Sequence, residues 1–275
     1  MKTREALTVS CLPSLEAEVL LSALLGKERS WLFAHSDTVL SSDEELKWNK
    51  WIARRRGGEP VAYIIGEREF YGRLFQVTPA VLIPRPATEE VVQRALEFLD
   101  HPGNKIVEAD AGIVVLSKIL RPEKTSLHDV SRARTVVDAG TGSGCIAITL
   151  ALERPDISVI ATDISEDALV IAGKNAERYG VADRIRFLKG SDLEPVHDLQ
   201  EPFLMVSNPP YIPQSRILAG EVMDFEPQGA LFAGDDGMTV LRRLLVQARD
   251  HPLCVGVILE CEQLQADVLL RGLKS

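Results

Sequence analysis

Residues 135–152 constrain the fold more than any other part of the chain. Residues 135–139 (TVVDA) are mostly apolar or β-branched, which is typical of a buried strand. Glycines follow at alternate positions, Gly140, Gly142 and Gly144, and the apolar run 145–152 indicates a buried helix. A strand, a glycine-rich turn and a helix in this order form the βα unit of a nucleotide-binding domain. We therefore expect a parallel sheet with the turn at its carboxyl edge.

Acidic residues accompany the ends of three successive predicted strands. Asp138 precedes the glycine turn, Asp163 ends the strand predicted at 158–162, and Asp192 follows the strand predicted at 185–188. A carboxylate in the second position can accept hydrogen bonds from ribose hydroxyls. The turn is one residue shorter than Gly-x-Gly-x-x-Gly and lacks a phosphate-binding lysine. S-adenosylmethionine, a cationic nucleoside without phosphates, fits these features better than NAD; alternatively, the glycines only make a tight turn and the aspartates cap helices.

A fourth predicted strand, 203–207, runs into Asn208-Pro209-Pro210-Tyr211. Two prolines cannot extend the ladder because neither has an N–H to donate, so the chain must leave the sheet at its carboxyl edge. The Asn208 amide oxygen and a proline carbonyl could accept both N–H bonds of a planar NH2 group, and Tyr211 offers a flat face. The same residue types occur in ordinary turns. Their position after the acidic strand ends favours a binding site.

On these motifs the chain resembles the class I S-adenosylmethionine-dependent methyltransferases. More narrowly, it resembles the HemK/PrmC glutamine methyltransferases of peptide chain release factors. The narrower resemblance rests on residues 56–72 (RGGEPVAYIIGEREFYG), 81–86 (VLIPRP), 225–227 (FEP) and 234–238 (GDDGM). It implies an α/β, Rossmann-like fold: a mostly parallel sheet with helices on both faces, a small N-terminal helical bundle and a linking β-hairpin.

The resemblance also implies an activity, namely methyl transfer from S-adenosylmethionine to the side-chain amide nitrogen of the glutamine in a Gly-Gly-Gln motif of release factors. One alternative is a glutamine of a ribosomal protein. A second is N6-methylation of adenine in a nucleic acid, since NPPY also occurs in such enzymes. A third is a non-catalytic nucleoside sensor, against which the intact NPPY motif argues. The sequence does not identify which release factor is the substrate.

Two sets of site residues follow. The expected catalytic residues are Asn208, Pro209, Pro210 and Tyr211. The expected cofactor-binding residues come from the glycine turn, the strand ends and the proline-rich segment: Asp138, Gly140, Thr141, Gly142, Ser143, Gly144, Asp163, Asp192, Leu193, Asn208, Pro84 and Arg85. We expect the glycines near the methionine part, Asp163 at the ribose and Asp192 with Leu193 at the adenine, while Pro84 and Arg85 wall the site. No metal is expected, because the histidines and cysteines lack metal-ligand spacing.

The chain divides into three predicted parts. Residues 1–58 form a helical substrate-recognition domain, 59–86 a β-hairpin linker, and 87–275 the catalytic domain with an insertion at 101–133. In the first part, a helix at 14–25 should end at Gly26, and a capping box from Ser42 to Glu45 should open a second helix, whose tryptophans we assign to the core. In the insertion, 113–120 is expected to form a short helix.

The chain departs from the family pattern in four places. Ala87 stands where the family usually has an acid, and Glu262 replaces the glycine of a Glu-x-Gly motif. The connection 101–133 is longer than usual. The chain ends at Ser275, before two further strands that the resemblance leads us to expect, so either the chain is truncated or the sheet lacks a hairpin.

The net charge of −9 disfavours nucleic-acid binding, so we expect no direct binding to DNA. The compact basic run Arg54-Arg55-Arg56 is expected to complement a helix C-terminus, the alternative being contact with an acidic protein or ribosomal RNA. No apolar run is long enough to span a bilayer, and no secretory signal is recognisable. The four cysteines form no Cys-x-x-Cys pair, and we interpret Cys145 and Cys254 as buried. We expect a cytoplasmic monomer.

Overall fold

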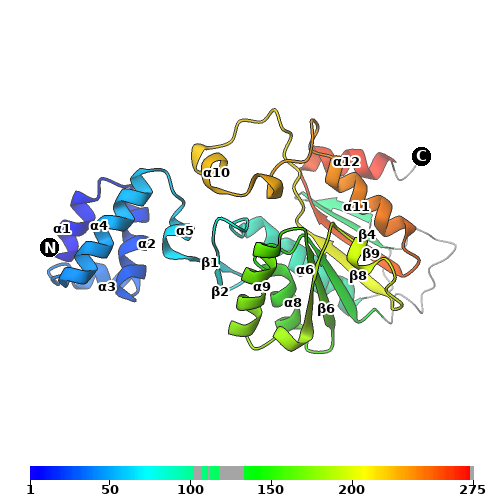
Figure 1. Ribbon diagram of the computed structural model, residues 1–275, viewed down its shortest axis with the longest axis horizontal. Coiled ribbons are helices and arrows are strands. Elements are labelled where there is room, and N and C mark those ends of the chain that lie inside the picture. The colour runs from blue at the N-terminus through cyan, green and yellow to red at the C-terminus, as the bar shows by residue number, and fades with distance from the viewer. Residues whose placement is uncertain (102–106, 111, 118–132, 273–275) are drawn as a thin grey trace. The chain divides into compact units, whose positions relative to one another are not determined.

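The computed structural model describes residues 1–101, 107–110, 112–117 and 133–272, and it divides into two units (Figure 1). Unit 1 comprises Met1–Glu67 and Leu218–Phe225, and unit 2 comprises Arg68–Ile217 and Glu226–Ser275. None of the helices in the described part of the chain combines the length and the apolar composition that crossing a bilayer requires.

Unit 1 is helical. Its elements are α1 (Thr3–Val9), α2 (Ser14–Leu25), α3 (Arg29–Ala34), α4 (Ser42–Arg56), α5 (Val61–Ile65) and α10 (Gly220–Phe225). Trp48 and Trp51 lie in its apolar core with Leu20 and Leu32, so the assignment of these tryptophans to the core is confirmed. Gly26 ends α2 with a φ of 61°, a left-handed conformation that glycine adopts without steric cost.

The capping box of α4 lies one residue earlier than predicted. The Ser41 hydroxyl accepts from the Glu44 N–H at 3.3 Å, and the Glu44 carboxylate accepts from the Ser41 N–H at 2.7 Å. Ser42 and Glu45 have the same spacing, so the sequence allows either register. Glu45 is engaged elsewhere, because its carboxylate pairs with the N-terminal amine of Met1 at 2.8 Å.

The basic run at the end of α4 forms contacts within unit 1. Arg54 donates to Glu59 at 2.7 and 2.5 Å, and Arg55 donates to Glu16 at 2.6 and 3.0 Å. Arg56 donates to the Ser10 carbonyl at 2.9 Å. These guanidinium groups therefore connect α4 to the neighbouring segments of its own unit.

A two-stranded sheet follows, formed by β1 (Glu67–Phe70) and β2 (Arg73–Gln76). The chain turns at Tyr71 and Gly72, whose φ angles of 53° and 70° are both positive. The predicted hairpin is confirmed, although residues 61–65 at the start of the predicted linker are helical.

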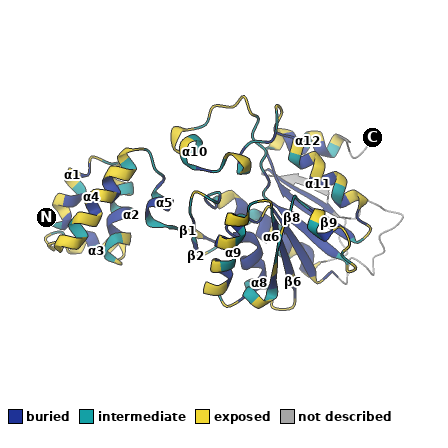
Figure 2. Cartoon of the chain, in the orientation of Figure 1, coloured by how far each residue is buried: buried dark blue, intermediate teal, exposed yellow. Residues whose placement is uncertain are grey.

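Unit 2 is built on a seven-stranded sheet in the order β3-β4-β9-β8-β5-β6-β7. The strands are β3 (Val107–Asp110), β4 (Ile113–Ser117), β5 (Thr135–Ala139), β6 (Ser158–Asp163), β7 (Ile185–Lys189), β8 (Phe203–Ser207) and β9 (Cys254–Glu260). The strands from β5 to β9 are parallel to one another, and β4 pairs antiparallel with β9. The central strands β5, β8 and β9 are buried along their whole length (Figure 2).

Helices cover both faces of this sheet (Figure 1). The helical elements are η1 (Pro86–Thr88), α6 (Glu89–Asp100), α8 (Cys145–Glu153), α9 (Glu166–Arg178), η2 (Ala182–Arg184), η3 (Glu194–Val196), η4 (Gln228–Ala230), α11 (Thr239–Asp250) and α12 (Gln263–Gly272). One apolar cluster joins α6, α8 and α9 to the sheet, and a second joins α11 and α12 to it. Cys145 and Cys254 are buried in these two clusters, as predicted. The predicted fold class is confirmed.

The segment predicted as a short helix at 113–120 is instead strand β4 over Ile113–Ser117. Its β-branched run suits a strand, and Val115 lies opposite Ile258 of β9. Residues 118–120 lie outside the described residues. Together, β3 and β4 form an antiparallel hairpin at the edge of the sheet. The segment that we predicted to be an insertion therefore supplies an edge hairpin of the sheet.

Candidate active site

The predicted site residues lie at the carboxyl edge of four neighbouring strands. Asp138 lies in β5, Asp163 ends β6, Asp192 follows β7 and Asn208 follows β8, and the spatial order of these strands is β8-β5-β6-β7. The Ser207 hydroxyl donates to the Ala139 carbonyl at 2.5 Å, which joins the end of β8 to the start of the glycine turn. The structure therefore brings the two main motifs together at the edge where open α/β sheets bind ligands.

The glycine turn has two distinct parts. All three of its glycines have positive φ: 75° at Gly140, 55° at Gly142 and 80° at Gly144. A Cβ atom at Gly140 or Gly142 would meet no atom within 4 Å, whereas one at Gly144 would lie 2.9 Å from Ile148 and 3.1 Å from Ala172. The first two glycines thus leave open space for close approach of a ligand, and the third lets α8 pack against α9. Ser143, which lies within this turn, is buried.

Asp138 is completely buried beneath the turn. Its Oδ2 accepts from the Thr141 hydroxyl at 2.7 Å and from the Ala147 N–H at 3.2 Å. Its Oδ1 has no hydrogen-bond partner among the described residues. Burial raises the pKa of Asp138 to about 7, with a further upward contribution from the charge of Asp163. A buried carboxylate with an open acceptor atom suits a positively charged ligand nearby.

Asp163 is held by backbone donors. It accepts from the Gly142 N–H and from the Ser165 N–H, both at 2.9 Å, while burial raises its pKa. The N-cap of α9 is Ser165, whose hydroxyl accepts from the Ala168 N–H at 3.2 Å. Asp163 therefore does not cap this helix. Each of its oxygens has a further lone pair for a ligand.

The segment after β7 is fixed by α11. Arg243 donates to the Asp192 carboxylate, and the Gln247 side chain accepts from the N–H of Leu193 at 3.0 Å. Asp192 has a φ of 53°, and Leu193 is buried. We did not predict Arg243 or Gln247, since each lies about fifty positions away in sequence and carries no local motif.

The NPPY loop is held from both sides. Asn208 Nδ2 donates to the Thr88 hydroxyl at 2.8 Å, and the Tyr211 hydroxyl donates to Glu260 Oε1 at 3.0 Å. The Tyr211 carbonyl accepts from Gln265 Nε2 at 2.8 Å. A Cβ atom at Gly237 would lie 2.2 Å from this same carbonyl, so the loop needs glycine there.

The Pro84–Arg85 segment is joined to the FEP motif by the buried side chain of Glu226. Arg85 donates to Glu226 Oε1 at 2.5 Å, and the Ile83 N–H donates to Oε2 at 3.2 Å. Pro84, which lies between Ile83 and Arg85 in the sequence, is buried. Two of the sequence motifs, separated by some 140 positions, therefore meet in unit 2.

The departures from the family pattern at Ala87 and Glu262 are readily accommodated. Ala87 lies exposed in η1. Glu262 forms an ion pair with Arg216, and it is not among the described residues with positive φ, so its backbone does not need glycine.

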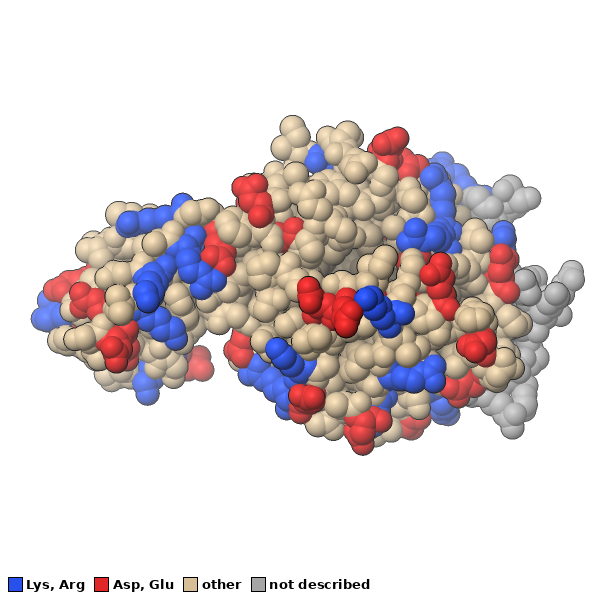
Figure 3. Space-filling model, viewed as in Figure 1, with Lys and Arg blue, Asp and Glu red and all other residues tan. Residues whose placement is uncertain are grey.

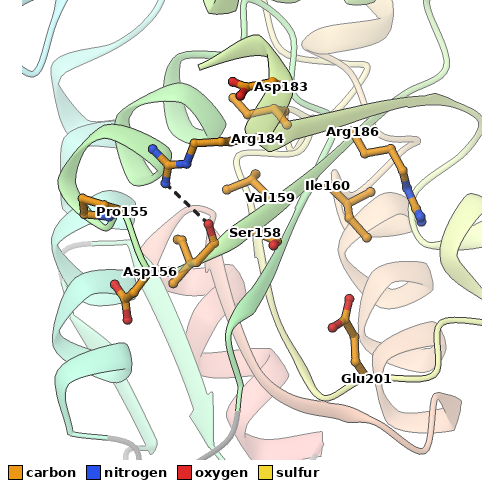
Figure 4. Close-up of a pocket in the computed structure, with 11 residues that line it drawn as sticks. Pro155, Asp156, Ser158, Val159, Ile160, Asp183, Arg184, Arg186 and Glu201 are labelled. Atoms are coloured by element: carbon orange, nitrogen blue, oxygen red, sulfur yellow. Dashed lines mark hydrogen bonds between the residues drawn. The ribbon is translucent and has the colours of Figure 1, made fainter. Parts of the chain in front are cut away.

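A separate groove of about 800 Å³ lies at the opposite edge of the sheet (Figure 4). It is lined by residues at the starts of β6 and β7 and just before β8, including Ser158, Arg186 and Glu201. Arg184 Nη2 donates to the Ile157 carbonyl at 3.5 Å beside it. The groove therefore contains none of the predicted site residues. In the described part of the chain, no group of three or more His, Cys, Asp or Glu side chains is arranged to hold a metal ion.

The fold and the carboxyl-edge motifs are those of a methyltransferase domain. Residues 89–226 match the family model described as the methyltransferase small domain, and residues 2–66 match the PrmC N-terminal domain. The chain shows 38% identity to a release factor glutamine methyltransferase of Nitratidesulfovibrio vulgaris, over 86% of this chain and 70% of that protein. It shows 39% identity to one of Bordetella pertussis, over 90% of this chain and 80% of that protein.

The chain therefore belongs to the release factor glutamine methyltransferase family. Among solved structures, the hMettl16 catalytic domain in complex with MAT2A 3'UTR hairpin 1 has a TM-score of 0.53 at 13% identity, covering 92% of this chain and 82% of that one. This similarity supports the fold alone.

Proposed function

We propose that the chain transfers a methyl group from S-adenosylmethionine to the side-chain amide nitrogen of the glutamine in the Gly-Gly-Gln motif of peptide chain release factors. The observation that carries this proposal is the position of Asn208, at the carboxyl edge beside the glycine turn, where its Nδ2 donates a hydrogen bond to the Thr88 hydroxyl. This contact leaves Oδ1 as the end of the amide that can accept from a substrate. The names of the curated relatives support the choice of substrate.

The residues of the glycine turn fit S-adenosylmethionine. The open space at Gly140 and Gly142 admits a ligand close to the backbone, and the unpaired Oδ1 of buried Asp138 suits its cationic methionine part. Asp163 would accept from the ribose hydroxyls, and the Asp192–Leu193 segment would border the adenine. Thr141, Ser143, Gly144, Pro84 and Arg85 complete the proposed surroundings. When bound, the sulfonium supplies an electrophilic methyl group.

The amide half of the site must compensate for a weak nucleophile, because the lone pair of an amide nitrogen is delocalised into its carbonyl. Asn208 Oδ1 and the Pro209 carbonyl would accept hydrogen bonds from the two N–H groups of the glutamine and so fix its nitrogen. The Tyr211 ring would lie beside the amide, and Pro210 would stiffen the loop. Such positioning can lower a barrier by about 7–11 kcal/mol at the limit. The same acceptors stabilise positive charge that develops on nitrogen as the N–C bond forms and the C–S bond breaks. The displaced proton would pass to water.

Residues 1–58 would bind the release factor. Residues 59–86 would serve as a linker, and residues 87–275 would form the catalytic domain. The described helices of this segment contain no nucleotide-binding or amide-binding motif. The basic run of α4 already forms contacts within unit 1, which argues against a role for it in binding RNA. Lys, Arg, Asp and Glu side chains are interspersed over the visible surface, which supports a protein substrate rather than DNA (Figure 3). The proposed enzyme acts as a monomer in the cytoplasm, where release factors work.

A labelling competition tests this proposal. The enzyme is incubated with S-adenosylmethionine labelled in its methyl group and, separately, with a release factor, a ribosomal protein fraction or DNA. We expect label on the release factor, and loss of that label when the Gly-Gly-Gln glutamine is changed to alanine. Label on the ribosomal protein or on DNA alone would overturn the choice of substrate.

A further inference from the structure

The amide of Asn208 must have a defined orientation if it is to bind a substrate NH2 group. The oxygen and nitrogen ends of an asparagine amide have nearly the same size, so shape alone does not distinguish them. If Nδ2 faced the substrate, its N–H groups would point at the N–H groups of the glutamine, and no hydrogen bond could form between these donors. The group that fixes the far end of this amide therefore decides whether the site can work.

That group is the Thr88 hydroxyl, which lies 2.8 Å from Asn208 Nδ2. A hydroxyl can accept from an amide nitrogen or donate to an amide oxygen, so it does not by itself select one orientation. Thr88 is only 2% exposed, and bulk solvent is thus kept from its proton. If the proton of this hydroxyl is directed to another acceptor, its oxygen can only accept a hydrogen bond from Asn208.

Glu260 supplies that acceptor at the end of β9. Glu260 is 4% exposed, and its Oε1 accepts from the Tyr211 hydroxyl at 3.0 Å. No donor among the described residues reaches Oε2 in hydrogen-bonding geometry, yet the Thr88 hydroxyl lies near enough to lower the pKa of this carboxyl. An ionised carboxylate only accepts hydrogen bonds, so Oε1 takes the Tyr211 proton and the buried Oε2 remains open as an acceptor for the Thr88 hydroxyl.

The pKa of Glu260 lies above its ordinary value, because burial outweighs three neighbouring groups that favour the ionised form. Burial raises the pKa of Glu260, while the Thr88 and Tyr211 hydroxyls and the Arg85 guanidinium lower it. Arg85 is kept in place by Glu226, whose side chain is 1% exposed and 2.5 Å away. The IPRP and FEP motifs thus fix the position of Arg85, whose charge lowers the pKa of Glu260.

We propose that Thr88 and Glu260 are positioning residues that orient the Asn208 amide with Oδ1 toward the substrate and Nδ2 away from it. Glu260 directs the Thr88 proton away from Asn208, Thr88 then accepts from Nδ2, and Oδ1 is left for the glutamine N–H. Glu260 holds Tyr211 at the same time. The inference rests on the proposed function, because it assigns Asn208 Oδ1 as an acceptor for the substrate amide.

Substitution at two positions, with a matched control, tests the proposal. Thr88→Val keeps the shape but removes the hydroxyl, Glu260→Gln keeps the size but removes the charge, and Thr88→Ser keeps the hydroxyl. Losing one buried hydrogen bond should lower kcat roughly 10- to 100-fold in Thr88→Val and Glu260→Gln. The KM for the release factor and the Kd for S-adenosylmethionine should stay unchanged, and Thr88→Ser should keep most of the wild-type kcat.

Two results would overturn it: a normal kcat in either Thr88→Val or Glu260→Gln, or an equal loss of kcat in Thr88→Ser and Thr88→Val. If Thr88→Val does not fold, Glu260→Gln and Thr88→Ser carry the test. A measurement without substrate separates this inference from the proposed function. In ¹⁵N-labelled protein, one Asn208 side-chain N–H should be protected from solvent exchange in the wild type and Thr88→Ser and exposed in Glu260→Gln. Equal protection in all three proteins contradicts the inference even if release factors prove not to be the substrate.

Discussion

At the scale of single residues, the carboxyl edge contains two kinds of polar group. Asp138 and Asp163 are carboxylates whose pKa values burial raises, and both contact the glycine turn through hydrogen bonds. Asn208 is neutral and is fixed by one hydroxyl. The acids suit a cationic cofactor, whereas the amide suits a neutral substrate group. Substitutions at the two kinds of residue should therefore affect different steps.

We expect Asn208→Ala to abolish nearly all methyl transfer while cofactor affinity is largely kept. The reason is that Asn208 faces the substrate amide in the proposed reaction, and its fixed partner Thr88 belongs to the protein. Calorimetry with S-adenosylmethionine, combined with the labelling assay on a release factor, checks both parts. Normal turnover in this variant would remove Asn208 from the reaction.

Asp138 should make the stability of the cofactor-free protein depend on pH. Burial raises its pKa to about 7, whereas in the unfolded chain it titrates near about 4. Between these values the folded state keeps a proton that the unfolded state has lost, so stability falls as pH rises. Asp138→Asn keeps an acceptor for Thr141 and Ala147 but cannot ionise.

The free energy of unfolding of the wild type should thus fall, relative to that of Asp138→Asn, by up to about 1.4 kcal/mol per pH unit across this window. Urea unfolding of both proteins at about pH 5 and about pH 7 measures the difference. Parallel pH dependence in the two proteins would mean that Asp138 ionises in the folded state as easily as in the unfolded chain.

At the scale of elements, the local sequence predicted where helices and strands end better than it predicted which residue caps the start of a helix. The end of α2 at Gly26 and the exit from β8 at Pro209 each follow from one residue with a restricted or permissive backbone. Ser41 and Ser42 each have a glutamate three residues later, so the sequence allows either to cap α4. In the structure Ser41 is the cap, and Glu45, the partner that Ser42 would need, pairs with the amine of Met1. A distant ion pair is not visible in local sequence.

Ser41→Ala should therefore destabilise unit 1 by about 1 kcal/mol, because it leaves the Glu44 N–H without its cap. Ser42→Ala is the matched control, and its effect should be within a few tenths of a kcal/mol. Urea unfolding followed by tryptophan fluorescence measures both, since Trp48 and Trp51 lie in the core of this unit. A larger loss in Ser42→Ala than in Ser41→Ala would support the register that the sequence first indicated.

At the scale of the whole molecule, the chemistry and the proposed recognition lie in different units. The acidic strand ends and the NPPY loop belong to unit 2, and residues 1–58 belong to unit 1. Deleting residues 1–58 should leave S-adenosylmethionine affinity unchanged and abolish methylation of an intact release factor. A short Gly-Gly-Gln peptide should be methylated equally by both forms. If the deleted enzyme methylated the whole factor at the normal rate, the helical segment would serve stability rather than recognition.

Much of this molecule follows from the sequence alone. The alternation of apolar strands and helices, the three glycines and the two prolines determine a parallel sheet with its motifs at one edge, because backbone freedom and hydrogen-bonding capacity are properties of the residues themselves. The same reasoning gave the core tryptophans, the hairpin within residues 59–86 and the grouping of Asp138, Asp163 and Asn208.

Only the tertiary structure decided the partners. Segment 113–117 forms strand β4 because β9 offers it an edge, Arg243 of α11 reaches Asp192, and Glu226 holds Arg85 from some 140 positions away. Thr88 and Glu260 likewise gain a role only when the fold brings them to Asn208 and Tyr211. Each of these contacts joins residues that are distant in the chain. Propensity and local spacing describe what a residue can do, whereas the packing of the whole chain determines which group it meets.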